Sequence, residues 1–502
     1  MTLPRPAPLA LAAATLTLAG CIAPPAVTLR EQPLEPERIG LSASPAPTAD
    51  ATWWTAYGDT QLDRLMQSAL ADNPSLAQAL ARVRAAQAGA DVARARELPT
   101  LGLDATEARQ RFSRDDVIPP PFAGGVHSEG HILLDFSWDL DFWGKQSALL
   151  AQARAQTQAA ELDLAGARLA LSGAMLEAYI DLDRQYALAD LAARTVAQRQ
   201  QMLDITQRRV AAGIDTNVEL RQAEGAVPAA EVERARTEAD RARAVHLVAA
   251  LSGRGADAYA DVARPTWRLD ATLPLPAELP ADLLARRPDV LGARRRIEAA
   301  TSGQAAAKAA FYPDVNLTAF SGFAAIGAGN LFDSASATYG VGPAIHLPIF
   351  DAGKLKAEYR GASAGIDQAV ASYNDTVLRA VRESADALSR IAALGDARLQ
   401  QRRALEAAEA AYRLAGERYR AGLSTYLTVL SAESQVLAAR RTDVDLVAAQ
   451  ASARVALMLA VGGPVDAAAP RAAAADDARA RDASHPAAEE THTVALHSAA
   501  TH

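Results

Sequence analysis

The sequence contains two similar copies of one segment, and this internal repeat constrains the fold more than any other feature. Residues 73–76 (NPSL) correspond to residues 287–290 (RPDV), with 214 positions between Pro74 and Pro288. Farther on, residues 212–216 (AGIDT) match residues 421–425 (AGLST), now with 209 positions between Gly213 and Gly422. The second copy is therefore five residues shorter in its middle part, between Pro313 and Gly353, which predicts a shorter loop there.

Each copy predicts the same order of elements: a helix, two strands and two long helices. The predicted helices cover residues 60–96, 145–211 and 215–252 in the first copy and residues 281–310, 354–415 and 424–461 in the second. They are rich in Ala, Leu, Gln, Arg and Glu, which favour helices. A helix of about 67 residues is about 100 Å long, and alanine-rich helices of that length pack as coiled coils. A spectrin-like rod would share these helices but would not explain the strands between them.

The strands are predicted by alternation of apolar and polar residues. They cover residues 100–112, 130–142, 314–324 and 338–349, with turns at residues 113–129 and 326–337. Such alternation fits a soluble sheet or a membrane barrel around a water-filled lumen. In the strand at 130–142, one alternating set of residues is rich in acidic residues and the other is apolar with aromatic residues. On an exported chain this pattern favours the barrel. The residues expected to face lipid are Ile132, Leu134, Phe136, Trp138 and Leu140, with Asp135, Ser137, Asp139 and Asp141 facing water.

Four strands cannot close a barrel, because the smallest barrels have about eight. An open sheet edge is not tolerated in lipid. The barrel must therefore be shared among several copies of the chain.

The N-terminus is typical of an export signal followed by a lipidation site. An apolar stretch at residues 9–18 is too short for a membrane span and ends in Leu-Ala-Gly before Cys21, the only cysteine. This tetrapeptide resembles a bacterial lipobox, so we expect residues 1–20 to be a signal peptide and Cys21 to be acylated. Ile22 is not the aspartate of an inner-membrane retention signal, which favours the outer membrane. Residues 21–51 then read as an extended tether.

Composition excludes several function classes. A net charge of -8 argues against a nucleic-acid partner. With 22% charged residues the chain is unlike a polytopic helical membrane protein. A single cysteine excludes an internal disulfide, and no nucleophile, phosphate-binding or metal-ligand constellation is present. We therefore expect no enzyme activity, no cofactor and no metal.

Short motifs occur in a fixed order along the repeated layout: residues 53–54 (WW), 58–59 (GD), 61–63 (QLD), 73–76 (NPSL), 139–145 (DLDFWGK), 283–290 (LLARRPDV), 311–313 (FYP) and 348–353 (PIFDAG). Together they resemble outer-membrane efflux lipoproteins of the TolC superfamily, specifically its NodT branch, over residues 52–463. The resemblance implies a mainly α protein with a transmembrane β-barrel, in which residues 52–263 and 264–463 form the two repeats. Residues 464–502 lie outside it and are expected to form a disordered tail.

The resemblance also implies an assembly and a function. A homotrimer would join a twelve-stranded barrel in outer-membrane lipid to a twelve-helix barrel in the periplasm. It would serve as the exit duct of a tripartite pump, together with a periplasmic adaptor and an inner-membrane transporter. Small toxic molecules are the expected cargo, and a TolC-like duct for protein secretion is the alternative.

The turns between the paired long helices are the candidate functional sites. Glycine allows a left-handed turn, and Asp or Ser followed by Thr can cap the next helix, so ordinary hairpin turns account for these residues. The resemblance additionally implies that they meet the adaptor, through Arg209, Gly213, Thr216, Arg420, Gly422 and Thr425. Many relatives carry acidic residues where this chain has Thr428 and Ser431. Asp215 and Glu219 are therefore the candidates for a negatively charged entrance.

Overall fold

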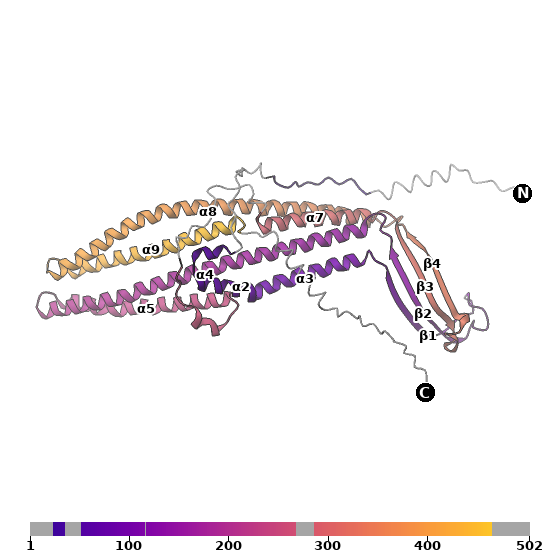
Figure 1. The fold of residues 1–502 in the computed structure, drawn as a ribbon, viewed down its shortest axis with the longest axis horizontal. Helices are drawn as coiled ribbons and strands as arrows, with labels where there is room; N and C mark the ends of the chain where they lie inside the picture. Colours follow the sequence, from indigo (N-terminus) through magenta and orange to yellow (C-terminus); the bar gives the residue numbers. More distant parts are fainter. Residues whose placement is uncertain (1–23, 36–51, 116, 268–285, 464–502) are drawn as a thin grey trace, which may run out of the picture.

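The molecule is elongated, with a sheet at one end and the loops of two helical hairpins at the other (Figure 1). The computed structural model describes residues 24–35, 52–115, 117–267 and 286–463. Their elements are η2 (Trp53–Tyr57), α2 (Thr60–Asp72), α3 (Pro74–Ala95), β1 (Thr100–Arg111), β2 (Val126–Asp139), α4 (Lys145–Ala211), α5 (Asn217–Leu251), η3 (Ala256–Asp261), α7 (Pro288–Ala309), β3 (Asp314–Ile326), η4 (Ala328–Asn330), η5 (Ser334–Ser336), β4 (Ala337–His346), α8 (Lys354–Arg420) and α9 (Tyr426–Ala460). The predicted order of helix, two strands and two helices occurs twice. Cys21 and the expected tail lie outside the described residues.

The two long helices, α4 and α8, have 67 residues each. The predicted bounds of α4 are confirmed, whereas the predicted end of α8 at residue 415 was wrong. Gly416 lies buried inside α8, and the helix continues to Arg420. Both helices end just before a glycine with positive φ, Gly213 at 71° and Gly422 at 75°.

The helix predicted over residues 60–96 is two helices. Asn73 is extended, with ψ of 124°, and its side chain caps α3 by accepting a hydrogen bond from the Ser75 amide at 2.9 Å. Arg287 is likewise extended between the helical Arg286 and Pro288, so the helix predicted over residues 281–310 is broken there and α7 begins at Pro288. Residues 281–285 lie outside the described ranges. In both places proline disfavours helical geometry in the residue before it.

The shorter helices stack end to end in pairs, α3 on α5 and α7 on α9 (Figure 1). The Asn73 side-chain amide donates to the Leu251 carbonyl at 2.9 Å, and the Arg287 guanidinium donates to the Ala460 carbonyl at 2.9 Å. At each junction a glycine with positive φ leaves no room for a side chain. A Cβ on Gly253 would lie 2.9 Å from the Asp72 backbone, and one on Gly462 would lie 3.0 Å from the Arg286 backbone. Each stacked pair thus forms one column beside a long helix.

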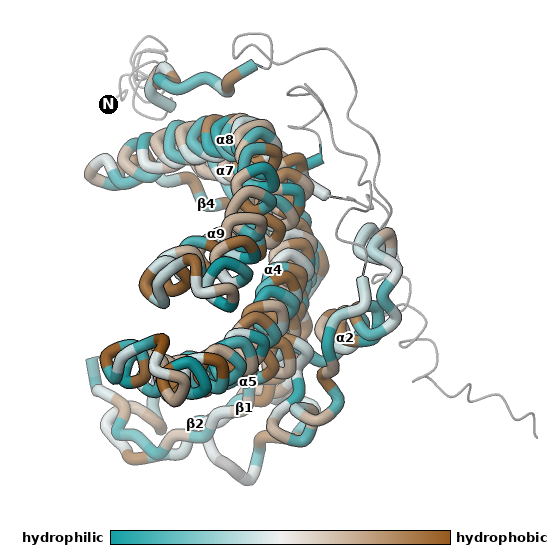
Figure 2. Tube along the Cα trace, turned by 90° about the vertical axis from the view of Figure 1, so that its left-hand side faces the viewer, coloured by the Kyte–Doolittle hydropathy of each residue, from teal (hydrophilic) through white to brown (hydrophobic). Residues whose placement is uncertain are grey.

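Seen along their length, the helices form a curved wall (Figure 2). α4 contacts α3, α5, α7 and α9, while α8 contacts α7 and α9. The wall therefore has two unlike edges, α8 on one side and the α3 and α5 column on the other. Both edges carry exposed apolar side chains, namely Leu378, Leu399 and Leu414 on α8 and Leu80, Val232 and Leu247 on the other column.

The largest core lies midway along the helices, where η2 and α2 pack against α4. Trp53, Trp54 and Tyr57 are buried there with Tyr179 of α4. The Asp59 carboxylate joins three segments, since it accepts hydrogen bonds from the Gln61 amide, the Tyr179 hydroxyl and the Thr266 amide, each at 2.8 Å. Burial alone would raise the pKa of Asp59, but these donors bring it below its ordinary value.

The four strands form one antiparallel sheet in the order β1-β2-β3-β4. The prediction that the second strand spans 130–142 was wrong at both ends, because residues 126–129 also pair with β1 and the ladder stops at Asp139. The fourth strand ends at His346 rather than 349, before Pro348, which has no amide to donate. The loop at residues 327–336 is shorter than the loop at 112–125. This agrees with the prediction of a shorter loop in the second copy, made from the decrease from 214 to 209 positions between matching residues.

Within the described ranges, no helix combines the length and the hydropathy of a membrane span.

Candidate functional site: the helical tips and the sheet

The two tips are Schellman turns built around glycine. The Gly213 amide donates to the Val210 carbonyl and the Ile214 amide to the Arg209 carbonyl, each at 2.9 Å. The second tip repeats this pattern, from Gly422 to Tyr419 at 3.0 Å and from Leu423 to Arg418 at 2.8 Å. The positive φ of both glycines agrees with the sequence prediction, and a side chain there would be strained.

The helices that follow the two tips are capped differently. Thr216 and Glu219 form a complete capping box at the start of α5, and these hydrogen bonds lower the pKa of Glu219. At the start of α9 the side chain of Thr425 makes no cap hydrogen bond. Thr428 stands where the first copy has Glu219, and its hydroxyl lies 3.3 Å from that of Thr425. The second tip is therefore the less strongly fixed of the two.

A polar cluster joins the two tips to each other; we call Thr206, Arg209, Asp215 and Tyr419 the tip cluster. The Arg209 guanidinium donates to both oxygens of the Asp215 carboxylate, at 2.8 and 3.0 Å. The Tyr419 hydroxyl donates to Asp215 at 2.6 Å and lies 3.0 Å from the Thr206 hydroxyl. Arg209 also donates to the Tyr419 carbonyl at 2.8 Å, with its guanidinium 4.4 Å from the centre of the Tyr419 ring.

The tip cluster is shielded from water and fixed in its protonation states. The side chains of Arg209 and Asp215 are 11% and 10% exposed. The Arg209 guanidinium holds the pKa of Asp215 below its usual range. Burial, together with the hydrogen bond to Asp215, raises the pKa of Tyr419 to about 12. The contact is thus an ionised pair with a neutral tyrosine at ordinary pH.

The candidates for a negatively charged entrance, Asp215 and Glu219, have different places. Asp215 belongs to the tip cluster, whereas the Glu219 carboxylate lies beside it and accepts from the Thr216 amide. Arg420, Thr428 and Ser431 are exposed. Thr428 and Ser431 lie three residues apart on α9 and so share one face of that helix.

Further polar contacts, on the sheet side of the tips, hold together the two helical hairpins, α4 with α5 and α8 with α9. Arg184 of α4 pairs with Asp445 of α9 at 2.7 Å, and Arg199 of α4 pairs with Glu433 of α9 at 3.1 Å. Arg441 of α9 pairs with Glu233 of α5 at 2.5 Å. The tip cluster is the last of these contacts, about 15 Å along α4 beyond Arg199.

Sequence reasoning did not identify Tyr419 as the partner of Asp215. The signal available was a difference between the copies, since Val210 occupies the place of Tyr419 in the first copy and Ser424 occupies the place of Asp215 in the second. Asp215 occurs only in the first copy and Tyr419 only in the second. Residues that differ between the copies in this way are candidates for a contact between them.

The sheet has one apolar and one polar face. Directly paired residues share a face, so the register places predicted lipid-facing residues of β2 beside apolar residues of the other strands. This face carries Leu101, Leu103 and Ala105 of β1, Ile132, Leu134, Phe136 and Trp138 of β2, Leu317, Ala319 and Phe323 of β3, and Tyr339, Val341 and Ile345 of β4. Ser321 lies among them as a polar exception, and the face becomes polar at the far end of β1, with Glu107 and Arg109. Leu140 lies just beyond β2, with its amide donating to the Val315 carbonyl at 2.8 Å.

The opposite face of the sheet is polar. Ser137 hydrogen-bonds Asn316 on the neighbouring strand, and His131 lies 2.7 Å from Asp104. Asp135 and Asp139 fall on the same side by the register, with Leu133, Phe320 and Ile326 as large apolar exceptions. The outer edges of β1 and β4 have no strand partner in the described chain.

Where the sheet meets the helices, contacts fix their relative position. The Trp143 ring stacks on Tyr312 with centroids 4.8 Å apart, and its indole N–H donates to the Pro313 carbonyl at 3.0 Å. Lys145, the first residue of α4, forms an ion pair with Asp314 of β3 at 3.0 Å. The sheet is thus tied to α4 by groups from both copies.

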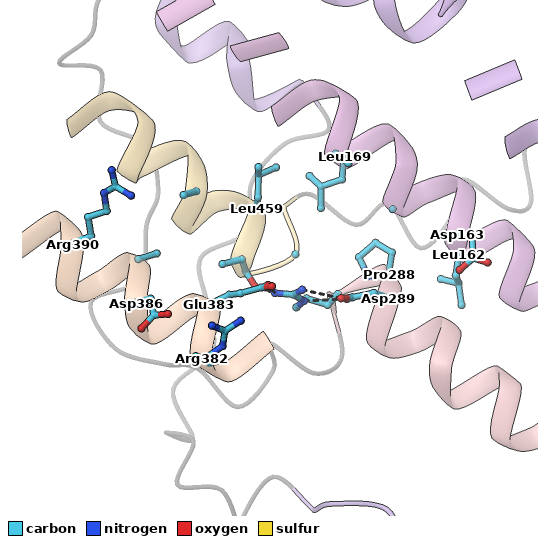
Figure 3. A pocket seen from close by; sticks show the side chains of 17 residues that line it. Leu162, Asp163, Leu169, Pro288, Asp289, Arg382, Glu383, Asp386, Arg390 and Leu459 are labelled. Atoms are coloured by element: carbon cyan, nitrogen blue, oxygen red, sulfur yellow. Dashed lines mark hydrogen bonds and ion pairs between the residues drawn. The ribbon is translucent and has the colours of Figure 1, made fainter. Parts of the chain in front are cut away.

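A buried arginine organises the junction of α7 and α9. Arg287 donates to both oxygens of Asp289, at 3.0 and 2.8 Å, and to Glu383 of α8 at 2.9 Å, in addition to the Ala460 carbonyl. It borders a cavity of about 720 Å³ between α4, α8 and the ends of α7 and α9 (Figure 3). One side chain therefore connects three helices.

The comparisons agree with this architecture. Residues 65–254 and 279–463 match the family described as outer membrane efflux protein. The fusaric acid resistance protein FusA of Burkholderia cepacia is 35% identical over 373 residues, covering 71% of this chain and 69% of its own. The probable efflux pump outer membrane protein TtgC of Pseudomonas putida is 30% identical over 464 residues, covering 91% of this chain and 95% of its own.

A solved structure has the same fold. The outer membrane protein VceC of Vibrio cholerae superposes with a TM-score of 0.77 at 35% identity, covering 83% of this chain and 99% of that chain. The match spans nearly the whole of that solved structure. The chain belongs to the outer membrane efflux protein family, the TolC superfamily, and is an outer-membrane efflux channel.

Proposed function

We propose that three copies of this chain form a passive exit duct, closed at the helical tips and opened there by a periplasmic adaptor. The observation that carries the proposal is the tip cluster, in which Tyr419 of the second hairpin bonds Arg209 and Asp215 of the first at the end farthest from the sheet (Figure 1). The Arg209–Asp215 ion pair lies within the first hairpin and holds both groups toward Tyr419 of the second. The hydrogen bonds of these two residues with Tyr419 are a suitable latch, since they exist only when the hairpins are together. The inner-membrane transporter would supply the energy and most of the selectivity.

The homotrimer is supported by the unlike edges of the wall and of the sheet. Joining one edge to a different edge of the next copy is a heterologous contact, which gives a ring when the rotation between copies closes, and the curvature of the wall (Figure 2) favours closure. Three copies would give twelve strands and twelve helical columns. The unpaired edges of β1 and β4 would then pair with each other across copies, as lipid requires.

The apolar face of the sheet is proposed to face lipid. We expect Phe136→Arg to cost roughly 2 to 4 kcal/mol near the bilayer midplane, and Ser137→Arg much less because it faces a wet lumen. The measurement is the amount of assembled trimer in isolated outer membranes, and the two variants are neighbours on one strand, so each controls for the other. Equal tolerance of both would contradict the face assignment.

The lipid anchor at Cys21 is proposed from the sequence, since this residue lies outside the described ranges. We expect mass spectrometry of the mature protein to find an acylated N-terminal cysteine, with residues 1–20 removed. Cys21→Ser should abolish the acyl mass but leave the trimer in the membrane, because the sheets also hold it there. A mature chain that starts elsewhere would contradict the anchor.

The cargo is proposed to be small molecules. FusA is named for fusaric acid resistance, and a second TtgC of Pseudomonas putida, 30% identical over 464 residues, is named as a toluene efflux pump protein. A deletion strain should become more sensitive to such compounds. Unchanged sensitivity, together with loss of a secreted protein, would favour the secretion alternative.

A further inference from the structure

The N-terminal segment lies against α8 as an extended chain. Residues 24–35 run beside this helix (Figure 1) and lie on the side of α8 away from α4 (Figure 2). The Asp367 carboxylate accepts hydrogen bonds from the amides of Arg30 and Glu31, at 2.9 and 3.1 Å. The Asn374 side chain accepts from the Leu34 amide at 2.8 Å and donates to the Gln32 carbonyl at 3.0 Å.

The spacing of the two side chains on α8 matches the pitch of an extended chain. Asp367 and Asn374 are two helical turns apart, which is about 10.5 Å along α8. Three residues of extended chain, from Glu31 to Leu34, also span about 10 Å. All four hydrogen bonds are made to backbone atoms of the segment, so the contact does not depend on the identity of its side chains.

Two sequence features point to a dedicated site. Pro33 keeps Gln32 in an extended conformation, which lowers the entropy lost on docking. In the first copy, the places of Asp367 and Asn374 are taken by Gln158 and Ala165. Asp367 and Asn374 are therefore not inherited from a pattern common to both copies. They occur only in α8, the helix that the segment contacts.

We propose that Asp367 and Asn374 form a docking site on α8 for the backbone of residues 30–34, which holds the lipid-bearing tether at a fixed distance from the sheet. Asp367 lies about 20 Å along α8 from Lys354 at the sheet end. The nine residues from Cys21 to Arg30 reach at most about 30 Å. A docked segment therefore lets Cys21 reach the sheet end of the helices and little farther. The role as a tether rests on the proposed acylation of Cys21, whereas the docking itself does not.

Hydrogen exchange of the purified full-length trimer in detergent, read by mass spectrometry with fragmentation, tests the docking. In the wild type the amides of Arg30, Glu31 and Leu34 should exchange at least about tenfold more slowly than in a free chain, because each is hydrogen-bonded. The double variant Asp367→Ala, Asn374→Ala should exchange there at the free-chain rate. Slow exchange that persists in this variant would overturn the proposal.

Matched variants separate the docking from other effects. Asp367→Asn keeps an acceptor oxygen and should keep the amides of Arg30 and Glu31 slow, while Gln158→Ala in the first copy should change nothing. Leu34→Pro removes the donor and should release the segment near Asn374, whereas Leu34→Ala should not. Cys21→Ser should leave the exchange unchanged. Fast exchange in Cys21→Ser would show that the acyl chains in the detergent micelle, not α8, hold the segment, and would overturn the docking site even with acylation confirmed.

Discussion

Replacing Arg287 with alanine is expected to destabilise the helical part of the molecule by roughly 3 kcal/mol, at the lower end of the range for breaking a buried ion pair. The change leaves Asp289 and Glu383 without their partner and the Ala460 carbonyl without a donor. The lower end applies because both carboxylates are more than a third exposed, at 38% and 39%. Guanidinium unfolding of the purified protein, followed by helical circular dichroism, measures the loss.

Two further substitutions define what Arg287 contributes. Arg287→Lys keeps the charge but has three donors on one nitrogen, which cannot reproduce the four hydrogen bonds of the guanidinium, so it should fall between wild type and alanine. Arg390→Ala removes an exposed arginine from the same helix, α8, that carries Glu383 and should change stability by less than about 0.5 kcal/mol. If Arg287→Ala behaves like Arg390→Ala, the junction does not depend on this side chain.

Replacing Asp215 with alanine should release the tips from each other. Between the hairpins, Asp215 accepts one hydrogen bond, from the Tyr419 hydroxyl, and the loss of this bond to a charged group should weaken the closed arrangement by roughly 2 kcal/mol. That shift changes the ratio of closed to separated tips by about thirtyfold. Spin labels at Ile214→Cys and Leu423→Cys, both exposed positions, report the separation in a Cys21→Ser background. The distance distribution should be narrow in the wild type and broad and longer in Asp215→Ala.

The neighbouring capping residue supplies the control for this experiment. Glu219→Ala removes a cap on the same turn but no bond between the hairpins, so its distance distribution should stay narrow. Asp215→Asn keeps an acceptor for Tyr419 and should have an intermediate effect. Identical distributions in wild type and Asp215→Ala would show that the tip cluster does not hold the hairpins together.

The tip cluster should be insensitive to ordinary changes of pH. The pKa of Asp215 is lowered in the closed state, so its contribution is present above the ordinary carboxyl pKa and is lost only as pH falls through the lowered value. The pKa of Tyr419 is raised to about 12, so its contribution is complete below its ordinary pKa and is lost as pH rises through about 12. The spin-label distances should therefore be constant from about pH 5 to about pH 9. A transition inside that range would point to another titrating group.

Much of the fold could be predicted because its signals are local. The bounds of α4 and the left-handed glycines Gly213 and Gly422 follow from helix propensity and from the geometry that only glycine adopts easily. The breaks before Pro74 and Pro288 were missed because the surrounding residues favour helix. The rule that proline restricts the residue before it, applied strictly, would have placed both breaks.

The contacts between distant segments could not be predicted in this way. Asp215 and Tyr419 are 204 residues apart, and Asp367 and Arg30 are 337 apart. Such pairs depend on how the hairpins pack, and no local pattern in one sequence records that. A comparison of the two copies position by position gives the one internal hint, because Asp215, Tyr419 and Asp367 each lack a counterpart of the same type in the other copy.

The central claim is that this efflux channel is a duct closed at the tip cluster. The most direct test is the single-channel conductance of the purified trimer in a planar bilayer without adaptor. The wild type should conduct weakly, and Asp215→Ala should give larger and longer openings, because the closed arrangement loses its latch. A wide and stable conductance in the wild type, unchanged in Asp215→Ala, would contradict a closed gate at the tips.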